Sequence, residues 1–490
     1  MVGAGAAGAA LAARLAAGGD PVLLLEAGPD FTTAETTLEV RGRDFHGQDD
    51  ALARHPELWW PDLFARRTPR QPPSLYKRGR GVGGTSTINA LMSIRGVVED
   101  YDGWAAMGAS GWSFAELLPT FRRLESDLDY PNSPWHGAEG PIPIHREPES
   151  GWGSVDRAFA ESVTDLGYGW APDHNQPGTT GGSPYGLNVR KGLRVSTNDA
   201  YLEPLRGHPN LTIAGGALVD RVLFDRLGAA AGVHLADGRE HRIDAGGEVV
   251  LSAGSVHSPA ILLRSGVGPA ANLKRLDIRP LADLPVGLGL QDHAVVPTPF
   301  SVDPGATAGA GNRHCNVCLR FSSSLEGAGS NDLFMIGVNS VFSTQGSIGL
   351  WLNRAFSTGR LTLASADPTV NPVIDLRLLS DARDRTRLLE GLERVREVAE
   401  HGALARLRTG LLALPEAERL DELIREGYHM TSTCRMGAEN DPRSVVDARC
   451  RVIGVRNLRV ADASVMPEVP RANTFLSSVM IGERVAELMG

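Results

Sequence analysis

"MVGAGAAGAALAARL" (residues 1–15) opens the chain and points to its fold class. Gly3, Gly5 and Gly8 follow the spacing G-x-G-x-x-G, in which the first glycine permits a tight turn and the second lets the backbone approach a pyrophosphate. The third glycine lets a helix pack on its strand, and the N-terminus of that helix stabilises negative charge. Because the chain holds 57 glycines in 490 residues, the spacing by itself is a weak signal.

The residues after the turn complete a nucleotide-binding unit. Residues 6–17 are rich in strong helix formers, and "GGDP" (residues 18–21) breaks the helix. "VLLLE" (residues 22–26) is an apolar run that ends in an acid, as a strand buried in a parallel sheet does. Glu26 is therefore placed to accept hydrogen bonds from a ribose diol. This order of elements predicts NAD or FAD rather than NADP.

Composition bounds the remaining possibilities. With 42% hydrophobic and 22% charged residues, the chain is typical of a globular protein. Its formal net charge of -9 argues against a nucleic-acid partner, because phosphates require a basic face. No apolar run approaches the roughly 20 residues of a membrane span, and no stretch reads as a secretion signal. We expect a cytoplasmic protein without a membrane span.

The cysteines do not indicate a metal site. Cys315 and Cys318 form a lone C-x-x-C, and no second ligand pair at zinc spacing accompanies it. We expect buried free thiols and no bound metal. Elsewhere, strands are predicted within residues 210–224 and 246–255, and a helix over residues 380–401 with Ser380 as its N-cap.

Four further blocks resemble signatures of the glucose–methanol–choline (GMC) flavoprotein oxidoreductases. They occur in the family's order as "RGRGVGGTSTINALMSIRG" (78–96), "GSVHSPAILLRSGVGP" (254–269), "VGLGLQDH" (286–293) and a C-terminal stretch from "HMTSTCRMG" to "VPRANTF" (429–475). Within the family the chain looks most like bacterial oxidases of (hydroxymethyl)furfural and aryl alcohols, on "WWPDL" (59–63), "WLNRAFSTGRLTLASADP" (351–368) and "VPRANT" (469–474).

The resemblance implies an α/β fold with two parts. A Rossmann-like FAD-binding domain would comprise residues 1–140, 186–295 and 426–490, the last of which carries the catalytic segment. A discontinuous substrate-binding domain, built on an antiparallel sheet flanked by helices, would comprise residues 141–185 and 296–425. Family members have several apolar residues before the first glycine, whereas here only Met1 and Val2 precede it. Either the true start lies upstream of Met1, or neighbouring strands suffice.

The resemblance also implies which residues hold FAD. Some relatives attach FAD covalently to a histidine two residues after the serine of "GGxS"; here that position is Ile88, so FAD is expected to be non-covalent. The expected contacts are Gly3, Gly5, Ala6, Ala7, Gly8 and Glu26 at the ADP half, Val219 at the adenine, Val82, Gly84, Asn89, Ala90, Leu91 and Met92 beside the flavin, Asp462 and Ala463 at the ribityl–pyrophosphate, and Asn473 and Thr474 at the ring.

The resemblance implies the oxidation of an alcohol, which loses a hydroxyl proton and a hydride. A histidine suits the proton because its ordinary pKa lies near 6.5, and a second polar group must stabilise the developing alkoxide. His429 matches the family's base and Asn473 its partner. His293 is expected only to close a turn, and His257 to support structure or cofactor.

The expected substrate is a primary, aryl or heteroaryl alcohol, with O2 or another compound as electron acceptor. Trp60, Trp351 and Tyr428 could wall an apolar pocket for an aromatic ring, and each could equally be core. Gly427 departs from the bulkier aliphatic residue of aryl-alcohol oxidases, which leaves more room near the flavin. The alternatives are an FAD-containing hydroxynitrile lyase and a flavin-poor, non-catalytic homologue.

Overall fold

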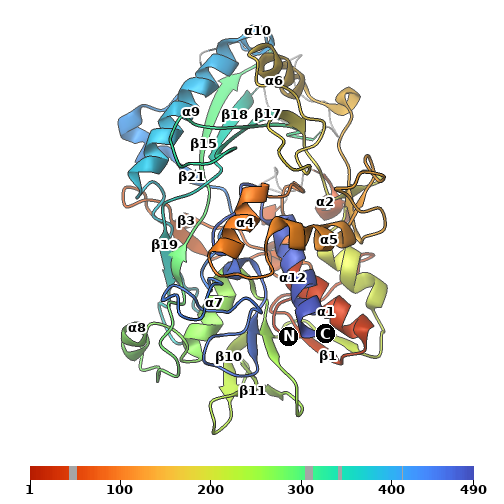
Figure 1. Cartoon of the computed structure of the whole chain (residues 1–490), viewed down its shortest axis with the longest axis vertical. Helices are drawn as coiled ribbons and strands as arrows, with labels where there is room; N and C mark the ends of the chain where they lie inside the picture. Colours follow the sequence, from red (N-terminus) through yellow and green to blue (C-terminus); the bar gives the residue numbers. More distant parts are fainter. Residues whose placement is uncertain (44–51, 304–312, 340–344, 411) are drawn as a thin grey trace.

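A computed structural model describes residues 1–43, 52–303, 313–339, 345–410 and 412–490. Helices and sheets are mixed throughout, which confirms the α/β class. In Figure 1 the chain forms a lower part that contains both termini and an upper part built on a long antiparallel sheet. The domain boundaries expected from the sequence stay a prediction.

The lower part is built on a parallel sheet that holds the glycine-rich turn. α1 (Ala6–Gly18) follows the turn, and β1 (Val22–Leu25) then pairs with β9 (Leu211–Ala214). On the other side β13 (Val249–Leu251) pairs with β22 (Leu458–Val460). Val2 bridges β1 and β13 in parallel, and its amide donates to Val250 O at 2.9 Å. Both neighbours therefore hold the short stub before the first glycine in place.

Two predicted elements differ in detail. Residues 210–224 form two strands, β9 and β10 (Val219–Phe224), because the chain breaks at Gly215 and Gly216, the latter with a φ of +65°. β10 pairs with β11 (Ala230–Leu235), and β11 with β12 (Glu240–Arg242), at the bottom of Figure 1.

The predicted helix at 380–401 is α9 (Ala382–Glu400), and the expectation of Ser380 as its N-cap was wrong. The cap is Asp381, whose side chain accepts from Arg383 N. Arg377 and Leu379 both have left-handed backbones (φ 50° and 61°), so the turn before the helix ends just ahead of Asp381.

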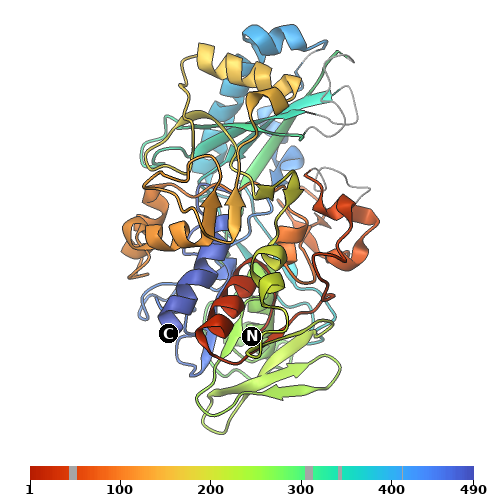
Figure 2. The same cartoon turned by 90° about the vertical axis from the view of Figure 1, so that its right-hand side faces the viewer.

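The upper part is a six-stranded antiparallel sheet covered by helices. Its order is β21 (Arg425–Glu426), β15 (Ala294–Ser301), β18 (Gln345–Leu352), β17 (Leu333–Asn339), β16 (Val317–Phe321) and β6 (Gly181–Pro184). Helices α6 (Ser154–Asp165) and α9 pack on it, α10 (Gly402–Leu407) packs against these two helices, and Figure 2 shows them above the sheet. A second sheet lies below it (Figure 1). Its strand order is β14 (Leu288–Leu290), β19 (Gly359–Thr362), β20 (Val373–Asp375), β2 (Phe64–Arg66) and β3 (Ser74–Leu75).

The two ends of the chain meet in one helix pair. α12 (Phe475–Met489) packs along α1, and both termini lie side by side in Figures 1 and 2. The contact is close because Gly482 faces the backbone of Ala7: a Cβ at Gly482 would lie 2.2 Å from Ala7 O. The middle of α12 therefore lies against the start of α1, just after the glycine-rich turn.

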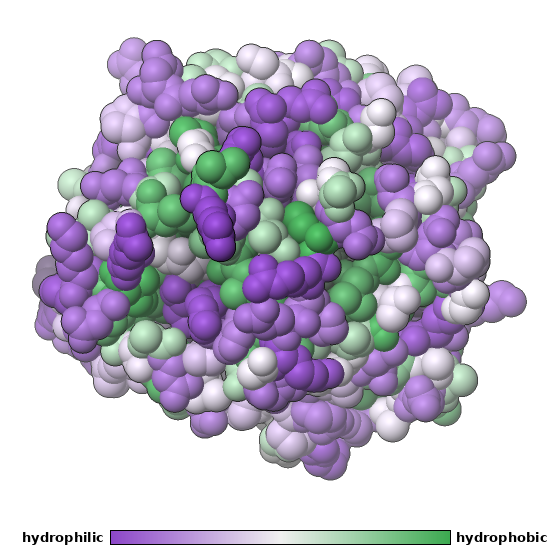
Figure 3. All heavy atoms as spheres, turned by 90° about the horizontal axis from the view of Figure 1, so that it is seen from below, coloured by the Kyte–Doolittle hydropathy of each residue, from purple (hydrophilic) through white to green (hydrophobic). Residues whose placement is uncertain are grey.

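The surface of the lower part is mostly hydrophilic. Seen from below, hydrophobic residues show only as separate patches between polar ones (Figure 3). Within the described ranges, none of the helices combines the length and the apolar character that a membrane crossing requires. All four cysteines are buried free thiols, as expected.

Candidate active site

A cavity of about 410 Å³ extends from the carboxyl ends of the parallel strands to the six-stranded sheet. Ligands of open α/β sheets bind at this end of the strands. The cavity gathers most residues that the sequence predicted, from segments far apart in the chain. These are Gly3, Gly5, Ala6, Ala7, Glu26, Trp60, Gly84, Asn89, Ala90, Met92, Val219, Trp351, Tyr428, His429, Asp462, Ala463, Asn473 and Thr474.

Three predicted cofactor contacts lie behind the cavity wall instead. Gly8 is buried in α1, where a Cβ would lie 2.0 Å from Gly3 O, so this glycine serves the packing of helix on turn. Val82 and Leu91 are fully buried, and Leu91 belongs to a separate apolar cluster. These three residues shape the wall from behind rather than line it.

The glycine-rich turn presents an anion-binding surface. Gly3 has a φ of +97°, and a Cβ there would lie 2.4 Å from Ser252 O, so only glycine fits. At Gly5 a Cβ would meet nothing closer than Gly84 Cα at 3.9 Å, and α1 begins with neither a capping side chain nor an acidic residue. The buried Ser252 hydroxyl lines the cavity without a hydrogen-bond partner among the described residues. This surface fits the pyrophosphate of a dinucleotide.

Two buried carboxylates hold this surface together. Glu26 accepts from three backbone amides, those of Ala4, Gly28 and Gly81, each at 2.9 Å. Asp462 accepts from Gly254 N at 2.9 Å and from the Ser258 hydroxyl at 2.6 Å, at the start of α7 (Gly254–Arg264). Burial raises the pKa of both carboxyls. Glu26 ties the turn to β1, and Asp462 ties α7 to the segment after β22.

A wall of the cavity runs over residues 252–257, of which the sequence had singled out only His257, as a support for structure or cofactor. All six residues line the cavity, and the block "GSVHSP" (254–259) marked the last four of them. The His257 ring lies against Trp60 with ring centroids 4.2 Å apart and a tilt of 35°, and Arg80 lies 5.0 Å from the Trp60 ring. Burial lowers the pKa of His257 to about 3. Trp60 thus packs against this wall as well as lining the cavity.

His429 and Asn473 meet at the other end of the cavity. His429 follows β21, and Asn473 lies just before α12. Asn473 Nδ2 lies 3.1 Å from His429 Nε2 and 3.7 Å from Met92 Sδ. The fold therefore brings the two predicted catalytic side chains within hydrogen-bond distance although 44 residues separate them.

Behind this pair lies a residue whose contact the sequence did not reveal. His293 Nδ1 lies 2.8 Å from His429 Nδ1, and His293 is fully buried. Asp292 Oδ1 accepts from the backbone amides of both histidines at 2.8 Å, and its Oδ2 accepts from Tyr76 OH at 2.7 Å. Burial raises the pKa of Asp292 to about 6 and lowers that of His293 to about 4. The block "QDH" (291–293) marked these residues but not their contact.

Aromatic side chains line the cavity around His429. Trp351 on β18 packs edge-on against Phe334, with ring centroids 6.2 Å apart. Tyr428 has a left-handed backbone (φ 60°), uncommon for a bulky residue, and its carbonyl accepts from Arg78 Nη1 at 2.7 Å. Gly427 lies between these groups, and a Cβ there would be 3.3 Å from Trp351 Nε1. The space that a glycine was expected to free is thus partly filled.

Comparison with known proteins identifies relatives over the full length. The GMC oxidoreductase family models match residues 1–295 (N-terminal domain) and 355–482 (C-terminal domain). The chain is 36% identical to 5-(hydroxymethyl)furfural oxidase of Methylovorus sp., over 99% of this chain and 97% of that protein. It is 32% identical to mitochondrial choline dehydrogenase of Mus musculus, over 100% of this chain and 88% of that protein.

Solved structures agree on the fold. The pyridoxine 4-oxidase from Mesorbium loti superposes with a TM-score of 0.88 at 28% identity, over 99% of this chain and 97% of that one. A fungal aryl-alcohol oxidase gives a TM-score of 0.83 at 21% identity, over 100% and 98%, and shares the fold.

These relatives confirm the class of reaction and the cofactor. The chain is an oxidoreductase that acts on the CH–OH group of alcohols and passes electrons to an acceptor. Its cofactor is FAD, since enzymes of this kind are FAD-dependent. By the match of both domain models and of the full-length relatives, the chain belongs to the GMC oxidoreductase family.

Proposed function

We propose that this enzyme oxidises a primary aryl or heteroaryl alcohol to the aldehyde, with His429 as the base and Asn473 as its partner. The observation that carries the proposal is the 3.1 Å approach of Asn473 Nδ2 to His429 Nε2 at the end of a cavity that begins at a pyrophosphate-binding turn. Proton acceptor and hydrogen-bond donor thus face the same point in space, as the oxidation of a hydroxyl group requires.

Each residue then has a defined part. His429 Nε2 accepts the proton of the substrate hydroxyl, while Asn473 Nδ2 donates to the same oxygen as negative charge develops on it. Bound FAD supplies the acceptor for the hydride that leaves the alcohol carbon. The turn at residues 3–7 and residues 252–257 would hold its pyrophosphate side. Ile88, an aliphatic side chain that lines the cavity, offers no nucleophile, so FAD binds without a covalent bond.

An aromatic substrate suits the lining near His429. Trp351, Tyr428, Ile336 and Met92 present apolar surface there, with the two polar groups placed among them. The relative at 36% identity is named for the oxidation of 5-(hydroxymethyl)furfural, a heteroaromatic primary alcohol. We infer the same class of substrate for this chain. O2 or another electron acceptor completes the cycle, and a cytoplasmic location and the absence of a nucleic-acid partner stay predictions.

The test is the visible spectrum of the purified protein before and after anaerobic addition of a benzylic or furanic alcohol. We expect a flavin band that bleaches, and that returns on admission of air if O2 is the acceptor. A flavin band that no alcohol bleaches, together with cleavage of a cyanohydrin, would identify a hydroxynitrile lyase instead. A colourless protein that takes up no added FAD would identify a non-catalytic homologue.

A further inference from the structure

The two histidine rings behind the cavity are joined nitrogen to nitrogen. His293 Nδ1 and His429 Nδ1 are 2.8 Å apart, the rings meet edge to face at 82°, and 136 residues separate them in the chain. At this distance one nitrogen must carry a hydrogen and the other a lone pair. Which ring donates decides which nitrogen of His429 is free for the substrate.

The amide of Asn473 fixes the direction of this hydrogen bond. Its Nδ2, a donor, points at His429 Nε2 and at the sulfur of Met92, a weak acceptor. His429 Nε2 therefore carries the lone pair. In a neutral imidazole the hydrogen is then on Nδ1, and this hydrogen faces His293 Nδ1.

We infer that His293 is a positioning residue, whose Nδ1 accepts the Nδ1 hydrogen of His429 and so keeps the Nε2 lone pair of the base turned toward the substrate hydroxyl. This inference rests on the proposed function, because it assigns a part in the reaction to a side chain that does not touch the cavity. The hydrogen of His293 itself then lies on Nε2, which is buried and has no hydrogen-bond partner among the described residues, although the backbone carbonyls of Pro470 and Asn353 lie beside this ring.

The acceptor behind the base is neutral. Burial keeps His293 uncharged at working pH, since it lowers the pKa of that ring to about 4. The charged and titratable groups around the pair are bound to others: Asp292 to Tyr76 and to two backbone amides, Arg78 to the Tyr428 carbonyl, and Glu426 to Arg67. A neutral acceptor selects the tautomer of His429 without the added negative charge that a carboxylate would bring.

The local sequence supports this contact. Asp292 Oδ1 accepts from the amides of His293 and His429 together, so one carboxylate holds both backbones in register. Gly427 N donates to His293 O at 2.8 Å, and a Cβ on Gly427 would lie 3.1 Å from His293 Cβ and 3.2 Å from His429 Nδ1. The glycine therefore leaves the space in which the two rings meet.

The experiment compares His293→Leu, which removes the acceptor, with His293→Gln, which retains one. The control is His174→Gln, because His174 is also fully buried and neutral but lies away from the cavity, bonded to Gly181 O and near Cys318. FAD content and circular dichroism check that each variant folds. Two properties are measured: the pH dependence of the anaerobic rate of flavin reduction by alcohol, and the tautomer of His429 by nitrogen NMR of protein labelled at the histidine rings.

We expect His293→Leu to lower the limiting rate of flavin reduction about 10- to 100-fold with little change in KM. This is part of the roughly 10²- to 10⁴-fold rate enhancement that a general base contributes as a whole. His293→Gln should keep a rate within about threefold of wild type. The His429 signal, assigned by its absence in His429→Gln, should report hydrogen on Nδ1 in the wild type, in His293→Gln and in the His174→Gln control, and a mixture in His293→Leu. A folded His293→Leu with the wild-type rate, pH profile and tautomer would overturn the inference.

Failure of the proposed function would look different. If no alcohol reduces the wild-type flavin, the reaction assigned above is wrong, yet the NMR comparison still tests the hydrogen bond between the two rings. If the wild type is reduced but His293→Leu and His293→Gln lose rate equally, a retained acceptor is not what matters, and the positioning role is rejected.

Discussion

His429 is held at three of its atoms. Its amide donates to Asp292, its Nδ1 meets His293 and its Nε2 meets Asn473. Such a ring cannot rotate without breaking two hydrogen bonds, so in the proposed reaction it would meet the substrate already oriented. Preorganisation of this kind lowers the barrier because less reorientation is needed during the reaction.

Replacement of His429 by glutamine should remove the base and leave the cofactor in place. We expect the rate of flavin reduction by alcohol to fall by about 10²- to 10⁴-fold, the contribution of a general base. FAD content should not change, because the pyrophosphate-binding turn lies at the far end of the cavity. Rapid mixing under anaerobic conditions measures the rate. A fall of less than tenfold would assign the proton to another group.

Replacement of Gly427 by alanine should disturb the same ring through packing. The new Cβ would lie 3.1–3.3 Å from His293 Cβ, His429 Nδ1 and Trp351 Nε1, tighter than ordinary contact. Overpacking of this kind costs about 1–3 kcal/mol, so we expect a lower limiting rate and a modest loss of thermal stability. Steady-state kinetics and a melting curve test this. An unchanged rate would show that β18 and β21 give way instead.

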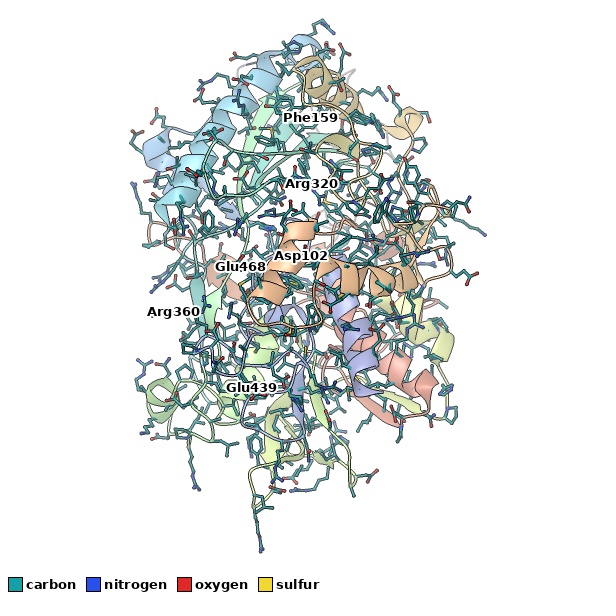
Figure 4. All side chains as sticks on the ribbon, viewed as in Figure 1. Asp102, Phe159, Arg320, Arg360, Glu439 and Glu468 are labelled. Atoms are coloured by element: carbon teal, nitrogen blue, oxygen red, sulfur yellow. The ribbon has the colours of Figure 1, made fainter. Side chains whose placement is uncertain are left out.

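At the scale of helices and strands, a few close contacts position the side chains of the site. Arg320 on β16 is buried and lies between Phe159 of α6 above and Asp102 of α4 (Val98–Ala106) below, as Figure 4 shows. Its guanidinium donates to His174 O at 2.9 Å and to Arg471 O at 3.2 Å. It thus fastens the segment that leads to Asn473 to the six-stranded sheet.

Replacement of Gly482 by alanine should loosen the α1–α12 pair. The Cβ would lie 2.2 Å from Ala7 O, a backbone atom, so the helices must separate. We expect about 1–3 kcal/mol lower stability and weaker FAD binding, because α1 carries the pyrophosphate-binding end. Melting temperature and FAD titration of the apoprotein measure the two effects.

The matched control for Gly482→Ala is Gly103→Ala in α4. A Cβ at Gly103 meets nothing within 4 Å, so alanine there should be neutral or slightly stabilising. If both alanine variants behave alike, the close approach of α1 to α12 is not what requires a glycine.

Across the whole molecule, one buried ion network stands apart from the active site. Asp127 and His136 are fully enclosed, and Glu125 Oε1 lies 2.6 Å from Arg95 Nη2. Arg146 Nη2 lies 2.5 Å from Asp173 Oδ1. The side chains of Glu125, Asp127 and His136 lie close enough together to be metal ligands. However, the negative charges of Glu125, Asp127 and Asp173 are already balanced by the guanidinium groups of Arg95 and Arg146 and by a protonated His136.

This network should make stability depend on pH. Burial opposes a charge on His136, but Asp173 and Glu125 outweigh it and raise the pKa of the ring to about 9. Because the pKa of a histidine in the unfolded chain is about 6.5, the protonated ring stabilises the folded protein fully below pH 6.5. This stabilisation is lost as the pH rises through 9. We expect the melting temperature to fall over that window, and to fall less in His136→Gln. Equal slopes would show that His136 is neutral in the folded protein.

Local motifs let the sequence determine the family and the cofactor, and let it predict the catalytic pair. Gly3, Gly5 and Glu26 lie within one βαβ unit, and His429 and Asn473 lie in two short blocks of a single segment, so their roles can be predicted without a structure. The sequence also determined α9, because its apolar positions repeat, but it misplaced the cap at Ser380.

Only the tertiary structure decided which distant residues support that site. Several contacts join parts of the chain that no periodicity links. They are those of His293 with His429, of Arg320 with Arg471, of Gly482 with Ala7, and of Val2 with its two neighbouring strands. From the sequence, a histidine that closes a turn cannot be distinguished from one that orients a base. They differ in what packs against the ring, and packing is settled only when separated strands and helices come together.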